Sequence, residues 1–221
     1  MADRPILFSA PMVTALLDGR KTQTRRALNP APFIDQMGNF CAPDRKGKIW
    51  NWGQNIDGTP CLRNYIKRIR FAVGDRLWVK ETHACVGDAD RWTLYRASGY
   101  EAECDRHGFD KPYPPESEIK WKPSIFMRRA LSRLTLTVTD VRVQRLQDCS
   151  EADALAEGVI EYEPTMEDPT EFSAFDGTDV FNNAVSAYRD LWNLINGAGA
   201  WEANPWVVAV SFDVRKGNID G

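Results

Sequence analysis

Residues 134–143 place the strongest constraint on the fold, because they alternate apolar and polar side chains with a period of two. In an extended chain Leu134, Leu136 and Val138 lie on one face, and the threonines between them lie on the other. This pattern predicts a half-buried β-strand. Such a strand needs neighbouring strands and a layer that covers its apolar face, so the chain is expected to contain a sheet.

The rest of the chain supplies both strands and helices. Short apolar runs predict further strands, and apolar residues at helical spacing predict helices. The predicted strands are residues 5–8, 22–27, 76–82, 92–97 and 205–212; the predicted helices are residues 10–17, 125–130 and 180–195, with one more between Ser150 and Gly158. This order predicts an α+β fold, namely a small mixed β-barrel flanked by helices.

We expect a single domain over residues 1–221 with two long insertions, at about 31–72 and 99–122. The first insertion is rich in Pro, Gly, Asn and Asp, and we expect one or two short strands in it with a hairpin at Trp50–Trp52. The second is polar and contains prolines, which is typical of a surface excursion or a lid. Residues 161–178 are expected to form an acidic loop.

Charge is unevenly distributed along the chain. Residues 1–150 contain 25 Lys and Arg against 17 Asp and Glu, whereas residues 151–221 contain 3 against 14. A basic body favours a polyanionic ligand on one face, although attraction between opposite faces of one domain explains the same numbers. The pI near 5.5 argues against indiscriminate binding to nucleic acid.

The five cysteines have no framework spacing, which predicts free thiols in a reducing compartment. The N-terminal residues lack the apolar region of a signal peptide, and no run approaches the roughly 20 apolar residues that span a bilayer. These features predict a cytoplasmic protein with no membrane partner.

The stretch Gly19–Arg26 is the leading candidate for function. Gly19 is expected to end a helix in the left-handed conformation, and four cations and two threonines follow it. In an extended strand Thr22, Thr24 and Arg26 point one way, whereas Lys21, Gln23 and Arg25 point the other. Such a group suits an anionic or polar ligand, and a solvated edge strand is the structural alternative.

Aromatic and basic residues elsewhere support a nucleic-acid ligand. Trp50, Trp52 and Trp78 are candidates for stacking on a base. Tyr65 lies within a basic run that contains Arg63, Lys67, Arg68 and Arg70, and this run fits either nucleic-acid contact or a solvated basic strand.

Cofactor and metal motifs give little support to other classes of function. His83-x-Cys85 and Cys104-x-x-His107 are two pairs of zinc-ligand types, but neither has the usual knuckle spacing, so we predict no metal. The chain has no phosphate-binding loop, no dinucleotide fingerprint and no nucleophile elbow, so we predict no nucleotide cofactor.

The stretch Gly19–Arg26 resembles the G-x-K-x-x-T-x-R signature of the ASCH domain family, whose members are PUA-like β-barrels thought to bind RNA. Three further stretches follow the order of that family, and the whole chain resembles ASCH-type proteins of phages and prophages. They are Val73–Val79, the strand-to-helix segment Leu146–Glu157 and the closing strand Trp206–Phe212.

Some compact ASCH proteins are amidohydrolases that deacylate N4-acetylcytidine with a Lys, a Thr and a Glu. By motif these correspond to Lys21, Thr24 and Glu157. In that chemistry the lysine takes the threonine proton and the hydroxyl attacks the acyl carbon, while the glutamate either orients the lysine or delivers a proton to the leaving amine. Arg20, Arg25 and Arg26 are the accompanying cations, with Arg26 holding an oxyanion or a base carbonyl.

Three functions therefore stay open. The first is hydrolysis of an N4-acylated cytidine. The second is binding of RNA or modified nucleic acid without chemistry, in which the same residues hold phosphate and a base edge. The third and weakest is a ribonuclease. A structural role for Glu157, as a helix-end carboxylate paired with an arginine, is the alternative to all three.

Overall fold

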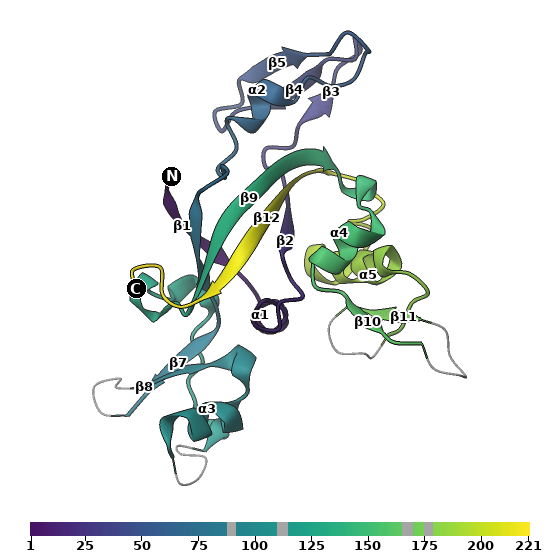
Figure 1. Ribbon diagram of the computed structural model, residues 1–221. Helices are drawn as coiled ribbons and strands as arrows, with labels where there is room; N and C mark the ends of the chain where they lie inside the picture. Colours follow the sequence, from purple (N-terminus) through teal and green to yellow (C-terminus); the bar gives the residue numbers. More distant parts are fainter. Residues whose placement is uncertain (88–91, 110–114, 165–169, 175–178) are drawn as a thin grey trace. The chain divides into compact units, whose positions relative to one another are not determined.

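The computed structural model describes residues 1–87, 92–109, 115–164, 170–174 and 179–221 (Figure 1). The chain divides into two compact units. Unit 1 comprises Met1–Lys21, Gly74–Thr137 and Asp213–Gly221, and unit 2 comprises Thr22–Val73 and Val138–Phe212. Each unit is described by itself below.

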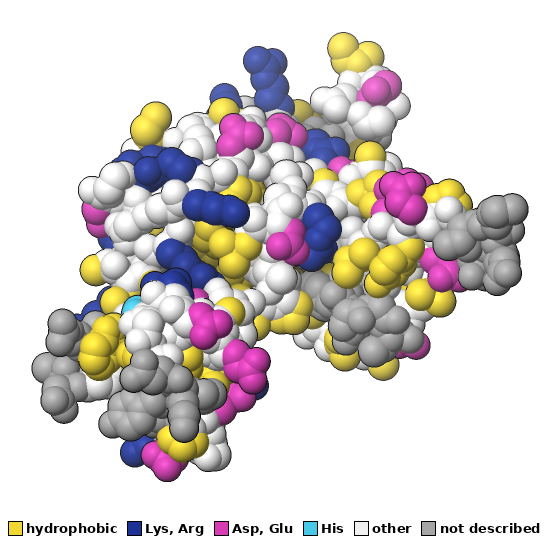
Figure 2. Space-filling model, turned by 60° about the horizontal axis from the view of Figure 1, so that its bottom comes forward, with side chains coloured by type: hydrophobic (Ala, Val, Ile, Leu, Met, Phe, Trp, Pro, Cys, Tyr) yellow, Lys and Arg dark blue, Asp and Glu magenta, His cyan; other side chains and the backbone are white. Residues whose placement is uncertain are grey.

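The α+β class predicted from the sequence is confirmed. The described strands form sheets and no closed barrel, and the largest sheet has the order β1-β6-β9-β12-β2. The buried residues are mainly aliphatic and aromatic. Charged side chains of both signs are interspersed over the face drawn in Figure 2.

Unit 1 is built on β1 (Asp3–Leu7), β6 (Arg76–Lys80) and the first residues of β9 (Leu134–Arg145). β1 runs parallel to β6, and β6 runs antiparallel to β9, with Leu77 opposite Leu136. Both leucines are fully buried, as the alternating pattern predicts. Helix α1 (Ala10–Leu17) begins after Ser9, and Gly19 follows its end with φ +77°.

The second predicted insertion contains a helix that was not predicted, because the segment is polar overall. Strands β7 (His83–Val86) and β8 (Trp92–Tyr95) pair antiparallel and lead through a 3₁₀ turn (Arg96–Ser98) into α3 (Tyr100–His107). Tyr100 and Cys104 of α3 pack against Leu94 of β8 in one small apolar cluster. Four-residue spacing of these two residues is the signal for that helix.

The helix predicted over residues 125–130 is wrong. Two short 3₁₀ turns (Ser124–Phe126 and Arg129–Leu131) stand in its place, and a third covers Glu116–Glu118. Met127 and Arg128 have extended backbones, with ψ 130° and 151°, so no helix continues through them. The side chain of Met127 is instead buried, at 2% exposed.

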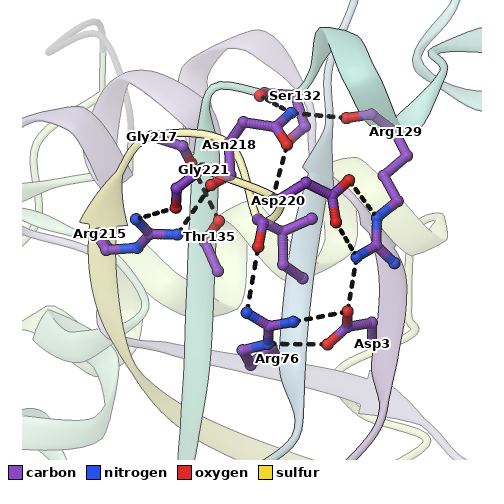
Figure 3. A network of polar contacts seen from close by, with 11 residues as sticks. Asp3, Arg76, Arg129, Ser132, Thr135, Arg215, Gly217, Asn218, Asp220 and Gly221 are labelled. Atoms are coloured by element: carbon purple, nitrogen blue, oxygen red, sulfur yellow. Dashed lines mark hydrogen bonds and ion pairs between the residues drawn. The ribbon is translucent and has the colours of Figure 1, made fainter.

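The last residues of the chain are held to unit 1 by a polar network (Figure 3). The guanidinium of Arg76 donates to both carboxylate oxygens of Asp3, at 2.9 and 2.8 Å, and to the carbonyl of Ile219 at 3.1 Å. Arg129 donates to Asp3 at 2.6 Å and also contacts Asp220. These contacts close over Ile219, which is 2% exposed.

Unit 2 places two helices beside a strand pair. β2 (Gln23–Ala27) runs antiparallel to β12 (Trp206–Lys216), which is longer than predicted. Helix α4 (Glu151–Ala156) begins with a capping box between Ser150 and Asp153, as the sequence predicts. Helix α5 (Ala184–Asn196) is capped by the side chain of Asn183, which places its start after residue 180.

The two helices share one apolar core. α4 contributes Ala154, and α5 contributes Tyr188, Leu191 and Trp192 from one face. The strand pair supplies Val207 to the same cluster. This packing fixes the end of α4 against the strands that carry the candidate site.

The first insertion is a small sheet of its own. Strands β3 (Phe33–Ile34), β4 (Phe40–Pro43) and β5 (Ile49–Gly53) pair antiparallel in that order, and α2 (Arg63–Ile66) follows. The hairpin predicted around Trp50–Trp52 is present as β4–β5, but its turn lies at Asp44–Gly47 and both tryptophans lie within β5. The basic run 63–70 begins as a helix, which excludes the alternative of a basic strand over residues 63–66.

Three turns of the first insertion repeat one pattern, in which an Asp or Asn stands three residues before a glycine. In each turn the glycine N–H donates to the carbonyl of that residue, over distances of 2.9 to 3.0 Å. The glycines have φ between +79° and +83°, a conformation that side chains disfavour. The three turns are Asp35–Gly38, Asp44–Gly47 and Asn55–Gly58.

The segment predicted as an acidic loop is partly regular. β10 (Ile160–Tyr162) and β11 (Glu171–Ser173) pair antiparallel, so the prediction of a loop over 161–178 is wrong at these positions. Ser173 is buried, and Phe172 packs on the α4–α5 core. Residues 165–169 and 175–178 of that prediction lie outside the described residues.

Candidate functional site

β2 carries the centre of the candidate site in unit 2. The N–H of Thr22 donates to the carbonyl of Ala156 at 2.8 Å, which fastens the start of β2 to the end of α4. Thr24 lies opposite Val210 of β12 and is 2% exposed. Arg25 comes next and is 4% exposed, which is rare for an arginine without partners.

Arg25 joins two carboxylates of α4. Its Nη1 lies 3.2 Å from Oε1 of Glu157, and its Nη2 lies 2.9 Å from Oδ2 of Asp153. The guanidinium carbon is 5.8 Å from the ring centre of Tyr188. Asp153 also accepts from Arg142 at 2.8 Å. Glu157, the residue that caps the C-terminal end of α4, thus has the arginine partner that a structural role requires.

Burial and charge shape the titration of these groups. Burial raises the pKa of Asp153, but the hydrogen bond from Arg142 and the charge of Arg25 outweigh it and hold that pKa well below its usual range. Burial and the neighbouring charge of Glu157 raise the pKa of Tyr188 well above its usual range. Burial raises the pKa of the Cys149 thiol to about 12. At neutral pH the site therefore holds Asp153 ionised, with a neutral phenol and a neutral thiol.

Lys21 is the last residue of unit 1 and is fully buried. Its N–H donates to the carbonyl of Ala15 at 3.0 Å, and its Nζ lies 5.8 Å from the ring centre of Phe8. Arg20 precedes it, and its guanidinium lies 2.9 Å from the carboxylate of Asp18. Both partners of that ion pair are partly exposed, so it contributes little to stability.

A cavity of about 440 Å³ in unit 2, called here the tryptophan pocket, brings together three of the predicted binding residues: Arg26, Trp50 and Trp52. The basic run supplies Tyr65, Arg68 and Arg70 to the same cavity, and Arg45 joins them. Burial lowers the pKa of Arg26, against the opposing charge of Glu157. Sequence reasoning missed Arg45, although it opens a run of three cations just before Trp50.

Arg68 stacks between the two tryptophans. Its guanidinium carbon lies 4.5 Å from the ring centre of Trp50 and 5.0 Å from that of Trp52. Lys48 lies over Trp50 at 4.2 Å, and the indole N–H of Trp50 donates to Asp44 at 3.2 Å. Among the lining residues that the structure describes, Asp44 is the acid, and its side chain also accepts backbone N–H groups of its own turn. The lining thus presents arginines and aromatic faces together.

Trp78, the third predicted stacking residue, belongs to unit 1. It lies in β6 between Pro5 of β1 and Thr135 of β9, and Lys80 lies 5.4 Å from its ring centre. The tryptophan pocket lies in unit 2 and does not include it. The structure therefore brings Trp50 and Trp52 together and gives Trp78 a different setting.

The histidine and cysteine pairs have structural partners. Cys104 is buried in the apolar α3 cluster together with Tyr100. His107 Nε2 lies 3.0 Å from the carbonyl of Thr93. Within the described ranges, no group of three or more His, Cys, Asp and Glu side chains is arranged to hold a metal ion.

In the part of the chain that the structure describes, no helix has the length and apolar character needed to cross a membrane. Comparisons with protein-family models, with curated proteins and with solved structures gave no match.

Proposed function

We propose that this chain is a nucleobase-binding protein of the ASCH type and that the tryptophan pocket receives a base of RNA or of a modified nucleic acid. The observation that carries the proposal is the convergence of Trp50 and Trp52 with four arginines in one cavity of about 440 Å³. Pockets for small ligands have volumes of this order. The PUA-like form of the barrel and the preference for RNA rest on the sequence resemblance.

The chemistry of the pocket suits a base with its phosphate. The guanidinium carbon of Arg68 lies 4.5 and 5.0 Å from the two indole ring centres, so the pocket already holds a planar cation against its aromatic rings. A base that stacks on such a ring gains about 1–3 kcal/mol. Arg26, Arg45 and Arg70 supply further guanidinium groups, which bind phosphate in a bidentate manner.

The insertion that forms much of this pocket is basic. Residues 31–72 contain seven Lys and Arg against three Asp. All three aspartates accept N–H groups within their own turns, and these hydrogen bonds lower the pKa values of Asp35, Asp44 and Asp57. A polyanion is therefore attracted to this insertion at every pH above the acid range.

Binding of a fluorescein-labelled single-stranded RNA, followed by anisotropy at several salt concentrations, tests the proposal. Trp52→Ala is expected to weaken binding about tenfold, from the loss of one stacked base. Arg70→Gln is expected to lower the salt slope by about one ion. Lys46→Gln is the matched control, because Lys46 is an exposed cation of the same insertion outside the pocket lining. Equal weakening by all three variants would mean nonspecific attraction and would refute a base pocket.

Hydrolysis of an N4-acylated cytidine is the second candidate. The observation that favours it is burial: Lys21, Thr24 and Glu157 are 0%, 2% and 3% exposed. In the implied reaction the Thr24 oxygen forms a bond to the acyl carbon while Lys21 takes its proton. The C–N bond then breaks, N4 of cytidine leaves with a proton from Glu157, and water hydrolyses the acyl-threonine.

Turnover of N4-acetylcytidine by the wild type and by Thr24→Ser, Thr24→Ala and Glu157→Gln separates the two candidates. A hydrolase loses turnover in Thr24→Ala and Glu157→Gln, and Thr24→Ser retains part of it because the hydroxyl nucleophile is kept. A binding protein shows no turnover in the wild type and retains RNA binding in Thr24→Ala. Circular dichroism of each variant controls for folding.

A further inference from the structure

Unit 1 contains a second cavity, called here the β7 pocket, with a volume of about 640 Å³. His83 and Cys85 of β7 form one wall, and Lys122, Phe126 and Arg128 of the following segment form another. Two backbone hydrogen bonds between His83 and Lys122, of 3.2 and 2.7 Å, hold the walls together. The cavity is therefore part of the fold of unit 1.

The described residues that line the β7 pocket carry charges of one sign. Among them Lys122 and Arg128 are charged, and none is acidic. The nearest carboxylate in sequence, Glu81, is 1% exposed and receives two hydrogen bonds of 2.9 Å from Arg133. That carboxylate is neutralised by its own arginine, so the cavity attracts anions.

His83 supplies a fixed hydrogen-bond acceptor. Its ring is 2% exposed, and its Nδ1 lies 3.2 Å from the carbonyl oxygen of Glu81. A carbonyl only accepts, so Nδ1 carries the proton and Nε2 has a lone pair. Burial lowers the pKa of His83, and the charges of Lys122 and Lys80 lower it further, which keeps the ring neutral. Nε2 has no hydrogen-bond partner among the described residues.

We propose that the β7 pocket binds a phosphate group whose ligand also carries a hydroxyl hydrogen, with Lys122 and Arg128 holding the charge and Nε2 of His83 accepting the hydrogen. Two cations alone bind any oxyanion, whereas a neutral acceptor beside them repels an anion that has no hydrogen to donate. Hydrogen phosphate has both groups. A sugar phosphate offers its charge and a sugar hydroxyl. This site lies in unit 1 and is argued independently of the tryptophan pocket.

Long-range ¹H–¹⁵N spectra of histidine side chains test the proposal, because the chain has two histidines and His107 is an internal control. Sodium phosphate is titrated against sodium sulfate at constant ionic strength and pH 7.5. Phosphate is expected to shift the His83 Nε2 resonance in a saturable manner and to leave His107 unchanged. Sulfate has no hydrogen to donate at this pH and is expected to leave the His83 resonance in place.

Variants of exposed residues test which cations bind the phosphate, and they leave the buried residues of unit 1 unchanged. Lys122→Gln and Arg128→Gln are each expected to weaken phosphate binding about tenfold, the size of one charge-assisted hydrogen bond. Lys120→Gln is the matched control, because Lys120 is an exposed neighbour that does not line the cavity. Equal weakening by Lys120→Gln, or an equal His83 shift with sulfate, overturns the proposal, as does the absence of any saturable shift.

Two further ligands distinguish the sources of the phosphate. Methyl phosphate at pH 8 has lost its last acidic hydrogen, since the second pKa of a phosphate ester is about 6, so it is expected to bind more weakly than inorganic phosphate. Ribose 5-phosphate restores a hydroxyl. Tighter binding of ribose 5-phosphate than of inorganic phosphate identifies a sugar phosphate as the ligand, and the reverse order identifies free phosphate.

Discussion

Replacing Arg25 by methionine is the sharpest test of the buried charge network in unit 2. Methionine keeps the length of the side chain and removes the guanidinium that joins Glu157 and Asp153. Removal of one partner of a buried ion pair costs about 3–5 kcal/mol, because the remaining charge is left in a poorly solvated place. Asp153 retains Arg142 at 2.8 Å, so we expect a loss near the lower end, about 3 kcal/mol at pH 7.

Arg142→Met is the matched control. Arg142 contacts the same carboxylate, but its side chain is 42% exposed, so water replaces it. Exposed ion pairs contribute up to about 1 kcal/mol, and we expect a loss within that limit. Urea unfolding followed by circular dichroism measures both variants. With a slope of about 1–3 kcal/mol per molar urea, a loss of about 3 kcal/mol lowers the midpoint by about 1–3 M.

The loss is expected to depend on pH. The pKa of Asp153 is lower in the folded chain than in the unfolded chain, so its ionised form contributes stability at neutral pH. That contribution is complete above the unfolded pKa of about 3.9 and is lost as the pH falls through the folded value. Arg25→Met moves the folded value upward, so the wild type and the variant should converge as the pH falls from 5 toward 2.

Two results would refute this reasoning. One is a loss in Arg25→Met no greater than the loss in Arg142→Met, which would mean that water reaches the network. The other is a difference between wild type and Arg25→Met that stays constant from pH 7 to pH 3.

Three further predictions concern local structure. Ser150→Ala removes the N-cap of α4 and should cost about 1 kcal/mol in urea unfolding, and a change below the error of that measurement would contradict the capping box. Gly87→Ala places a Cβ 2.2 Å from a tryptophan ring of β8 at φ +82°, whereas Gly47→Ala meets nothing within 4 Å at φ +81°. Both variants cost about 1–2 kcal/mol of backbone strain, and only Gly87→Ala adds the contact with the ring. Gly87→Ala should therefore lower the Tm more than Gly47→Ala, and equal changes in Tm would exclude a clash with the ring. Cys149, with its pKa raised to about 12, should resist a thiol reagent at pH 8 in the folded chain while the half-buried Cys61 reacts, and equal rates would show that the site opens.

The elements that the sequence predicts well are those with local signals. The alternation at Leu134–Val138 lies within β9, and the glycine after α1 has the predicted left-handed backbone. The capping box of α4 needs only Ser150 and Asp153, four residues of chain. Each of these signals acts within one turn or one strand, so no distant contact overrides it.

The errors lie where distant packing decides. Helix α3 is polar overall, and only Tyr100 and Cys104 face its small core, so composition alone hides it. The segment 125–130 has apolar residues, but Met127 turns inward on an extended backbone. β10 and β11 pair residues about ten positions apart within an acidic stretch. The alternation of apolar and polar residues does not predict these two short strands.

In the candidate site, too, features with a local sequence signal were predicted, and features that depend on distant contacts were not. Alternation along β2 correctly separates Arg25, which reaches α4, from Arg26, which lines the tryptophan pocket. The partners of Arg25 come from residues more than 120 positions away and have no local signal. The contact of Arg68 with the rings of Trp50 and Trp52 depends on how the chain after β5 folds back on that strand. No local sequence pattern predicts it.

The three repeated turns of the first insertion have a consequence for how its aromatic face is assembled. Each turn closes within five residues, through a backbone bond that a single Asp or Asn and a glycine specify. Contacts of such short sequence separation carry a small loop-closure cost and form quickly. Trp50 and Trp52 are thus presented by a meander of low contact order, whose apolar side is completed by Val143 and Trp206 from later in the chain.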